Sequence, residues 1–250
     1  MTGSQIPVIS LDQCIIATDL HCNGGAQRSI WFRSLLNRCR ELSSSLLLLG
    51  DLFDLWCGDE QLEAADYQSE IDLLRHATNS GTSISIIPGN RDFLLGQRFE
   101  AATGVKILGD AVEIQWAGER WHCSHGDLLG TEDHGYQRLR RVLRHPLTRS
   151  VLTSLPMVLR KGLAGGIRSG SRRSIEKKTK VKMQPDLRVV EGILAQGYDR
   201  ILCGHFHVSR REKVYCPGKE GVFQVLEPFE ERGAYLLLRD RAEQIEWWGC

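Results

Sequence analysis

Short apolar runs that each lead to a polar, ligand-type residue constrain this chain most. Runs of this length are typical of buried strands. A strand needs apolar periodicity, but it gives no reason for an aspartate, asparagine or histidine just beyond its end. The runs cover residues 13–18, 46–49, 83–87, 120–124 and 200–203.

Helical patterns lie between the first three runs, with apolar residues at helical spacing over 26–43 and 60–80. Alternation of strands and helices predicts an α/β fold, in which ligands bind in the loops just past the strand ends. The second half is richer in strands, so we predict a second sheet and a sandwich of two sheets flanked by helices. The further strands are expected at 112–116, 222–226, 234–238 and 244–248.

Residues 134–196 interrupt this pattern. The span 147–167 is largely apolar, whereas residues 160–182 hold nine Lys or Arg residues and one acid. We therefore predict a core of residues 1–133 and 197–250, with an inserted helical cap at 134–196. A plain helical hairpin with a solvated charged face is the alternative. Helices are expected at 134–145, 147–164, roughly 171–182 and 186–196.

Composition and charge narrow the setting. The 250 residues are 42% apolar with a net charge of +1, so we expect a monomer and no nucleic-acid partner. Eight cysteines form no CxxC pair, which favours reduced, structural thiols in the cytosol. No signal peptide is visible, and no run of about 18 apolar residues predicts a membrane span.

The ligand-type residues suit a pair of divalent cations, which need hard oxygen and imidazole ligands and a bridging carboxylate. Asp51 follows an all-leucine strand and a glycine, which makes it the natural bridge. Asp19 and His21 are two residues apart, as are His205 and His207. An extended segment would place the two members of each pair on the same side. The seven residues are Asp19, His21, Asp51, Asn90, His125, His205 and His207.

Each of these residues alone has an ordinary explanation. A strand-end aspartate is often a helix cap, and a Gly-Asn pair is often a turn. Their conjunction in this order instead predicts a two-metal phosphoesterase site.

The motifs resemble the signature of the calcineurin-like metallophosphoesterase superfamily: D-x-H, G-D, G-N-R-D, H-G and G-H-x-H. The resemblance implies a four-layer αββα sandwich and two divalent ions, with Mn²⁺ the first choice and Fe²⁺ or Zn²⁺ possible alternatives. It also implies attack of a metal-activated water on phosphorus. One ion would bind Asp19, His21, Asp51 and His207, and the other Asp51, Asn90, His125 and His205.

Residues beside these ligands resemble a narrower group, the bacterial UDP-2,3-diacylglucosamine diphosphatases, over residues 19–210. The resemblance implies hydrolysis to UMP and 2,3-diacylglucosamine 1-phosphate (lipid X) in lipid A synthesis. It implies a cytoplasmic enzyme, peripheral on the inner face of the cell membrane. The matching blocks are 50–59, 89–99 and 125–127, the last followed by Thr131, Asp133, Gly135, Tyr136 and Gln137.

Arg91 stands next to a metal ligand, where its guanidinium suits a phosphate bound bidentately. We place it with Asp51, Asn90 and His125 among the catalytic residues. A salt bridge to Asp92 or another neighbour is the alternative for Arg91.

Further substrate contacts come from the resemblance. It implies that Asp133 and Tyr136 touch the sugar or nucleotide, although an ordinary packed aromatic is the alternative for Tyr136. Arg168, Ser171 and Lys178 match substrate-binding positions of the cap, and Asn90 and His205 are also expected to contact substrate. The sequence departs from the family pattern at Gly170, Ile175 and Glu227-Pro228-Phe229.

The insert also predicts partners. Its apolar part is expected to hold two acyl chains, and its basic part to face the diphosphate or the anionic inner-membrane surface.

Two other functions remain open. A related enzyme acting on a soluble nucleotide phosphodiester or diphosphate would give no role to apolar cap residues such as Leu152, Leu155 and Met157. A non-catalytic scaffold would be expected to have lost metal ligands, whereas all seven are present.

Overall fold

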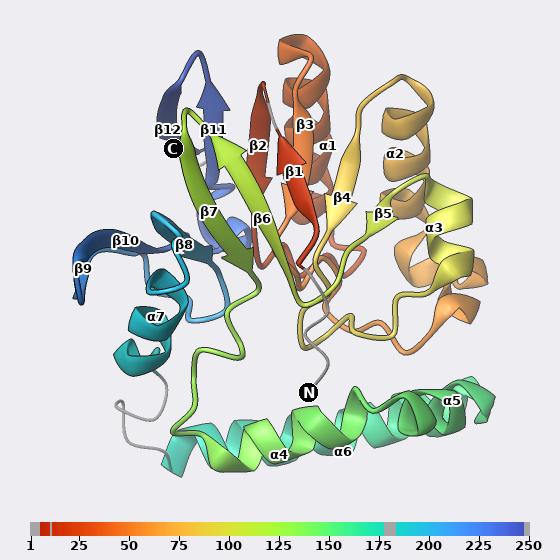
Figure 1. Ribbon diagram of the computed structural model, residues 1–250. Coiled ribbons are helices and arrows are strands. Elements are labelled where there is room, and N and C mark those ends of the chain that lie inside the picture. The colour runs from red at the N-terminus through yellow and green to blue at the C-terminus, as the bar shows by residue number, and fades with distance from the viewer. Residues whose placement is uncertain (1–5, 11, 178–183, 248–250) are drawn as a thin grey trace.

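The computed structural model describes residues 6–10, 12–177 and 184–247, with the backbone alone for residues 168–177. These residues form two six-stranded sheets (Figure 1). Sheet A has the order β1 (Val8–Ser10), β6 (Ala111–Trp116), β7 (Glu119–Ser124), β8 (Arg200–Cys203), β10 (Lys219–Val225) and β9 (Arg210–Cys216). Sheet B has the order β12 (Ala242–Glu246), β11 (Tyr235–Arg239), β2 (Cys14–Ala17), β3 (Ser45–Leu48), β4 (Ile84–Ile86) and β5 (Lys106–Ile107).

Three apolar clusters define four layers. Helices α1 (Ala26–Leu42), α2 (Gln68–Asn79) and α3 (Gln97–Thr103) cover the outer face of sheet B. The two sheets pack face to face, and α7 (Leu187–Leu194) covers the outer face of sheet A. Because both faces of β2 are buried, its side chains alternate between two clusters: Ile15 packs under the helices and Ile16 between the sheets. The expected αββα sandwich is therefore confirmed.

The expected strands are present, and α1 begins at the expected residue. The helix expected over 60–80 is shorter, because its first part forms the 3₁₀ turns η1 (Asp59–Glu63) and η2 (Ala65–Tyr67). Side chains of Gln61 and Tyr67 donate to the carbonyl of Leu55 there, and these bonds compete with a regular helix.

Several elements gave too weak a signal to be predicted. β9 lies at the edge of sheet A and begins with four charged residues, so it contains no apolar run of strand length. α3 has only seven residues, and the carboxylate of Asp59 caps it from outside by accepting bonds from the N–H groups of Gly96, Arg98 and Phe99. β1, β5 and α8 (Phe229–Arg232) are shorter still.

The insert forms helices α4 (His134–Leu143), α5 (Pro146–Ser154) and α6 (Met157–Lys177), which lie across one end of both sheets (Figure 1). The helix expected over 147–164 is interrupted, since Pro156 cannot continue α5. The separate helix expected from residue 171 is instead the end of α6. α7 packs on β8 and β9, so this last part of 134–196 lies with the sheets. Among the described residues, no helix has both the length and the apolar character needed to cross a bilayer.

Arg160 anchors the cap to the core. Its side chain is only 4% exposed and donates to the carbonyl of Cys57 at 2.8 Å and to both carboxylate oxygens of Glu60. Gly58 has a φ of 134°, and a Cβ there would overlap the Arg160 guanidinium. Arg160 therefore attaches α6 of the cap to the core. Among the nine basic residues of 160–182, Lys161 is the other with a described side chain, and it pairs with Asp66 of the core at 3.1 Å.

We expect Arg160→Ala to loosen α6 and to lower the free energy of unfolding by about 1.5–3 kcal/mol, because it leaves a buried carbonyl unpaired. Denaturant unfolding and hydrogen exchange of α6 would measure this. Lys161→Ala is the matched control, since its exposed ion pair contributes less than about 1 kcal/mol. Equal effects of the two substitutions would contradict the anchoring role.

Candidate metal centre

The ligand-type residues gather at one edge of the sandwich because of strand direction. β2, β3 and β4 run parallel in sheet B, and β7 and β8 run parallel in sheet A. Parallel strands bring their carboxyl ends to the same edge. The five motifs follow these five strands, so residues from Asp19 to His207 meet in one place.

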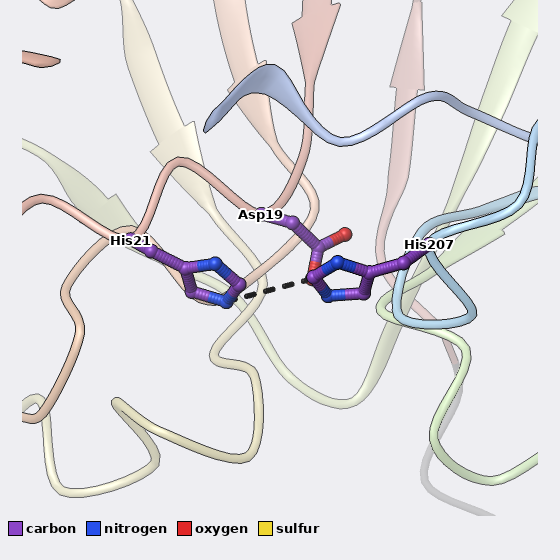
Figure 2. Close-up of side chains that lie close together, drawn as sticks. All are labelled: Asp19, His21 and His207. Atoms are coloured by element: carbon purple, nitrogen blue, oxygen red, sulfur yellow. Dashed lines mark ion pairs between the residues drawn. The ribbon is translucent and has the colours of Figure 1, made fainter. Parts of the chain in front are cut away.

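Asp19, His21 and His207 form the first group (Figure 2). The Oδ1 atom of Asp19 lies 3.9 Å from Nε2 of His21 and 3.5 Å from Nε2 of His207. The two imidazole rings stack with their centroids 5.4 Å apart. The predicted pairing of a D-x-H segment with the last histidine of G-H-x-H is thus present in the geometry.

Asn90, His125 and His205 form the second group. Oδ1 of Asn90 lies 3.0 Å from Nε2 of His125 and 3.1 Å from Nδ1 of His205. The Nδ1 atom of His125 lies 2.8 Å from the carbonyl oxygen of Leu49, so Nδ1 must carry the proton. The Nε2 atom of His125 therefore points toward its neighbours in the group.

Asp51 lies between the two groups. Its Oδ2 atom is 3.3 Å from Nε2 of His21, and its Oδ1 atom is 3.8 Å from Nε2 of His125. Burial alone would raise the pKa of Asp51, but the neighbouring histidines lower it below its usual value. A buried carboxylate with one oxygen toward each group has the arrangement required of a bridge.

Two observations test whether cations fit. Oδ1 of Asp19 is buried and accepts no hydrogen bond within the described part of the chain, yet it faces two imidazole nitrogens. In the second group three polar side-chain atoms converge, with Oδ1 of Asn90 within 3.1 Å of Nε2 of His125 and Nδ1 of His205. A cation in each group would satisfy these atoms, so the donor set fits divalent metal ions.

The loops that carry these side chains are strained. Five of the seven residues have left-handed backbones, an arrangement that costs about 1–2 kcal/mol for each non-glycine residue. Strain of this kind clusters at functional sites. The φ angles are 52° at Asp19, 46° at His21, 54° at Asp51, 69° at His205 and 53° at His207.

Hydrogen bonds clamp the loops in place. Asp92 is fully buried, and its two oxygens accept the backbone N–H groups of Leu52 and Gly89, each at 2.7 Å. Burial and the charge of Asp51 raise the pKa of Asp92 to about 6. The Thr18 hydroxyl donates to Asp19 at 2.7 Å. The sequence placed Asp92 within a motif but gave it no structural role.

The pKa values of two histidines shift in opposite directions. Burial, followed by the charge of His125, lowers the pKa of His205 to about 4. For His21 burial also favours the neutral form, but the carboxylates of Asp51 and Glu230 outweigh it and raise the pKa to about 9. Glu230 is a neighbour of the site that the sequence did not indicate.

Arg91 points its guanidinium at two carboxylates, with Nη1 2.7 Å from Oδ1 of Asp54 and Nε 3.4 Å from Oδ2 of Asp51. The alternative of a salt bridge therefore holds in part, but the partner is Asp54, since Asp92 accepts backbone bonds. The Arg91 side chain remains 29% exposed. The Arg91 guanidinium can therefore contact a ligand that binds beside the two groups of ligand-type residues.

The predicted substrate residues of the cap have different settings. The Tyr136 hydroxyl donates to Asp127 at 2.8 Å, and the Tyr136 ring lies 6.0 Å from that of His205. Asp133 caps α4 by accepting the N–H of Tyr136. The side chains of Arg168 and Ser171 and the whole of Lys178 lie outside the described residues.

An apolar cavity of about 320 Å³ adjoins the second group. It runs between the cap helices and the loops after β3 and β4. Arg140 of α4 and Arg144 at its C-cap also line it; neither was singled out from the sequence, because both fall within a helical pattern. Its lining includes Asn90, Arg91, Phe93, Tyr136, Leu139, Leu143, Leu152, Leu163 and Ile167.

The cluster of ligand-type residues thus lies at the strand ends of a two-sheet α/β sandwich. No family model matches the chain. A Pseudomonas putida protein named UDP-2,3-diacylglucosamine hydrolase is 35% identical over 216 residues, 86% of this chain and 89% of the relative. A Pseudomonas syringae pv. tomato protein of the same name is 36% identical over 218 residues, 86% of each chain. The chain belongs to the UDP-2,3-diacylglucosamine hydrolase family and is a hydrolase. A solved archaeal phosphodiesterase has a TM-score of 0.46 at 12% identity, over 94% of this chain and 99% of that one.

We expect Gly89→Ala to disrupt the centre, because a Cβ at this position would overlap the Asp51 carboxylate and backbone nitrogen. Overpacking of this kind costs about 1–3 kcal/mol, and the displaced carboxylate should also reduce metal content. Denaturant unfolding and elemental analysis would measure the two effects. Gly109→Ala is the control, since nothing lies within 4 Å of its added Cβ. Wild-type stability and metal content in Gly89→Ala would contradict the packing argument.

Proposed function

We propose that this protein hydrolyses the diphosphate of UDP-2,3-diacylglucosamine to UMP and 2,3-diacylglucosamine 1-phosphate, a step of lipid A synthesis. The observation that carries the proposal is the apolar cavity beside Asn90, Arg91 and Tyr136, directly next to the ligand cluster. An apolar cavity adjoining a phosphate-cleaving site suits a substrate with a diphosphate and acyl chains. The relatives named UDP-2,3-diacylglucosamine hydrolase support the same substrate.

In this proposal Asp51 bridges two divalent ions, of which Mn²⁺ is our first choice. When bound, such ions favour deprotonation of water and stabilise negative charge on phosphate oxygens. One would be held by Asp19, His21, Asp51 and His207, and the other by Asp51, Asn90, His125 and His205. Hydrolysis adds water across the P–O–P bond, so both products are monophosphates.

Arg91 has the clearest role among the other side chains. Its guanidinium now pairs with Asp54 at 2.7 Å, and both residues line the cavity. A bound diphosphate would compete for the same donors, since arginine binds phosphate bidentately. Arg91 would then orient the substrate and offset its charge. Tyr136 would flank the substrate from the cap side, and Asp133 stays a predicted contact.

The outer face of the cap supports a peripheral position on the cytoplasmic face of the membrane. Leu147, Val151, Val158 and Leu159 of α5 and α6 are each more than half exposed. Exposed aliphatic side chains on helices suit the interface of a bilayer, where an acylated substrate also resides. Arg168, Ser171 and Lys178 remain proposed substrate contacts of the cap.

The direct test is incubation of purified protein with UDP-2,3-diacylglucosamine and Mn²⁺, with release of UMP as the readout. We expect UMP from the wild type, and none from Asp51→Ala, which removes the proposed bridge. Bis-p-nitrophenyl phosphate serves as a generic phosphodiester. If it were cleaved while the lipid substrate stayed intact, the protein would be a metallophosphoesterase with another substrate.

A second prediction concerns the cavity. Leu152→Asp places a charge in its apolar wall and removes a contact worth about 1.5–3 kcal/mol when a leucine is fully buried. We expect kcat/KM for the diacylated substrate to fall roughly 10- to 100-fold. Hydrolysis of bis-p-nitrophenyl phosphate should be little changed.

Ser150→Asp is the matched control, because Ser150 belongs to the same helix and its side chain is exposed. Steady-state kinetics of both variants on both substrates would decide the matter. Equal losses on the two substrates for Leu152→Asp would argue against an acyl-binding cavity.

A further inference from the structure

A short helix near the C-terminus of the chain lies against the first metal loop. α8 follows Pro228, and its first two N–H groups bond to that loop: Phe229 donates to the carbonyl of Thr18 at 2.9 Å, and Glu230 donates to the carbonyl of Asp19 at 3.2 Å. These bonds place the Glu230 side chain beside the ligand group. This turn is also where the sequence departs from its family's pattern.

The Glu230 carboxylate contacts both histidines of the first group. Its Oε1 atom lies 2.7 Å from Nδ1 of His21 and 3.7 Å from Nδ1 of His207. In each ring the other nitrogen, Nε2, faces Oδ1 of Asp19, at 3.9 and 3.5 Å respectively. Each imidazole thus has one nitrogen toward the metal position and the other toward Glu230.

Arg28 of α1 holds Glu230 in this position. Its Nη2 atom lies 2.6 Å from Oε2 of Glu230, so the second carboxylate oxygen is also engaged. Its Nη1 atom donates to the backbone carbonyl of His21 at 2.5 Å. The Glu230 side chain is 19% exposed, so water competes little for its oxygens. Arg28, Glu230 and His21 form a closed set of contacts.

We propose that Glu230, held by Arg28, is a positioning residue that fixes the ring orientation and the protonated nitrogen of His21, and that it also flanks the ring of His207. A carboxylate beside the second nitrogen of a ligating histidine sets its tautomer and makes it a better ligand. Glu230 therefore favours metal occupancy at the first group specifically. This inference rests on the proposed metal site but not on the substrate.

The experiment is calorimetric titration of metal-free protein with Mn²⁺. We expect Glu230→Gln to weaken one of the two binding steps about 10- to 100-fold and to leave the other unchanged. Glu231→Gln is the matched control, because Glu231 is the next residue of α8 and its side chain is exposed. The unfolding temperature of the metal-free variants checks that glutamine preserves the fold.

The His21→Ala background identifies which step is affected. If Glu230 acts through the first group, Glu230→Gln should weaken Mn²⁺ binding far less in His21→Ala than in the wild type, because interacting residues are non-additive. Two wild-type binding steps in Glu230→Gln would overturn the inference, as would equal weakening of both steps. Failure of the wild type itself to bind two Mn²⁺ ions would instead overturn the proposed metal site.

Discussion

Asp19 and Asp51 are buried side by side, and their carboxylates repel each other. The rest of the site is arranged to offset this repulsion. Removing a carboxylate from water costs several kcal/mol unless partners replace the lost hydration. Oδ2 of Asp19 is satisfied by the Thr18 hydroxyl and the N–H of His205. Its Oδ1 atom faces imidazole nitrogens and no hydrogen-bond donor within the described chain. Cations that bind the folded chain and not the unfolded one would therefore stabilise the fold by mass action.

The same constraint explains why the loops are strained and tightly packed. Strands of both sheets deliver the ligand-type residues to one edge, but only abrupt turns can aim their side chains at a common point. Left-handed backbones at Asp19, Asp51 and His207 make those turns. Gly89 and Gly204 allow the loops to approach so closely that a Cβ at either would overlap a neighbouring side chain. The sheets offset the backbone strain of these loops, because their buried strands hold the ends of the loops rigid.

The sequence predicted the parts of the structure that depend on local pattern. Buried strands and their terminal polar residues were visible because apolar runs are short-range signals, and these indicated the seven ligand-type residues. Contacts between distant segments were not visible. Glu230 contacts His21, although the two residues are more than 200 positions apart in the sequence. Glu230 also lies outside the motifs that indicated the site. In the sequence Arg160 looked the same as the other basic residues of its stretch, but in the structure it is buried against Cys57 and anchors the cap. Pro156 was a local signal that should have divided the helix expected over 147–164.

Different parts of the chain hold the two halves of the centre. The first group is braced by α8 through Glu230. The second is braced by the cap: Arg144, at the C-cap of α4, donates to the carbonyls of Pro88 and Gly89, next to Asn90. Arg140 of the same helix binds Asp127 at 2.6 Å, two residues beyond His125. These bonds connect α4 and its C-cap to the loops that carry Asn90 and His125. Because α4 also lines the apolar cavity, whatever fills that cavity is mechanically linked to the second group.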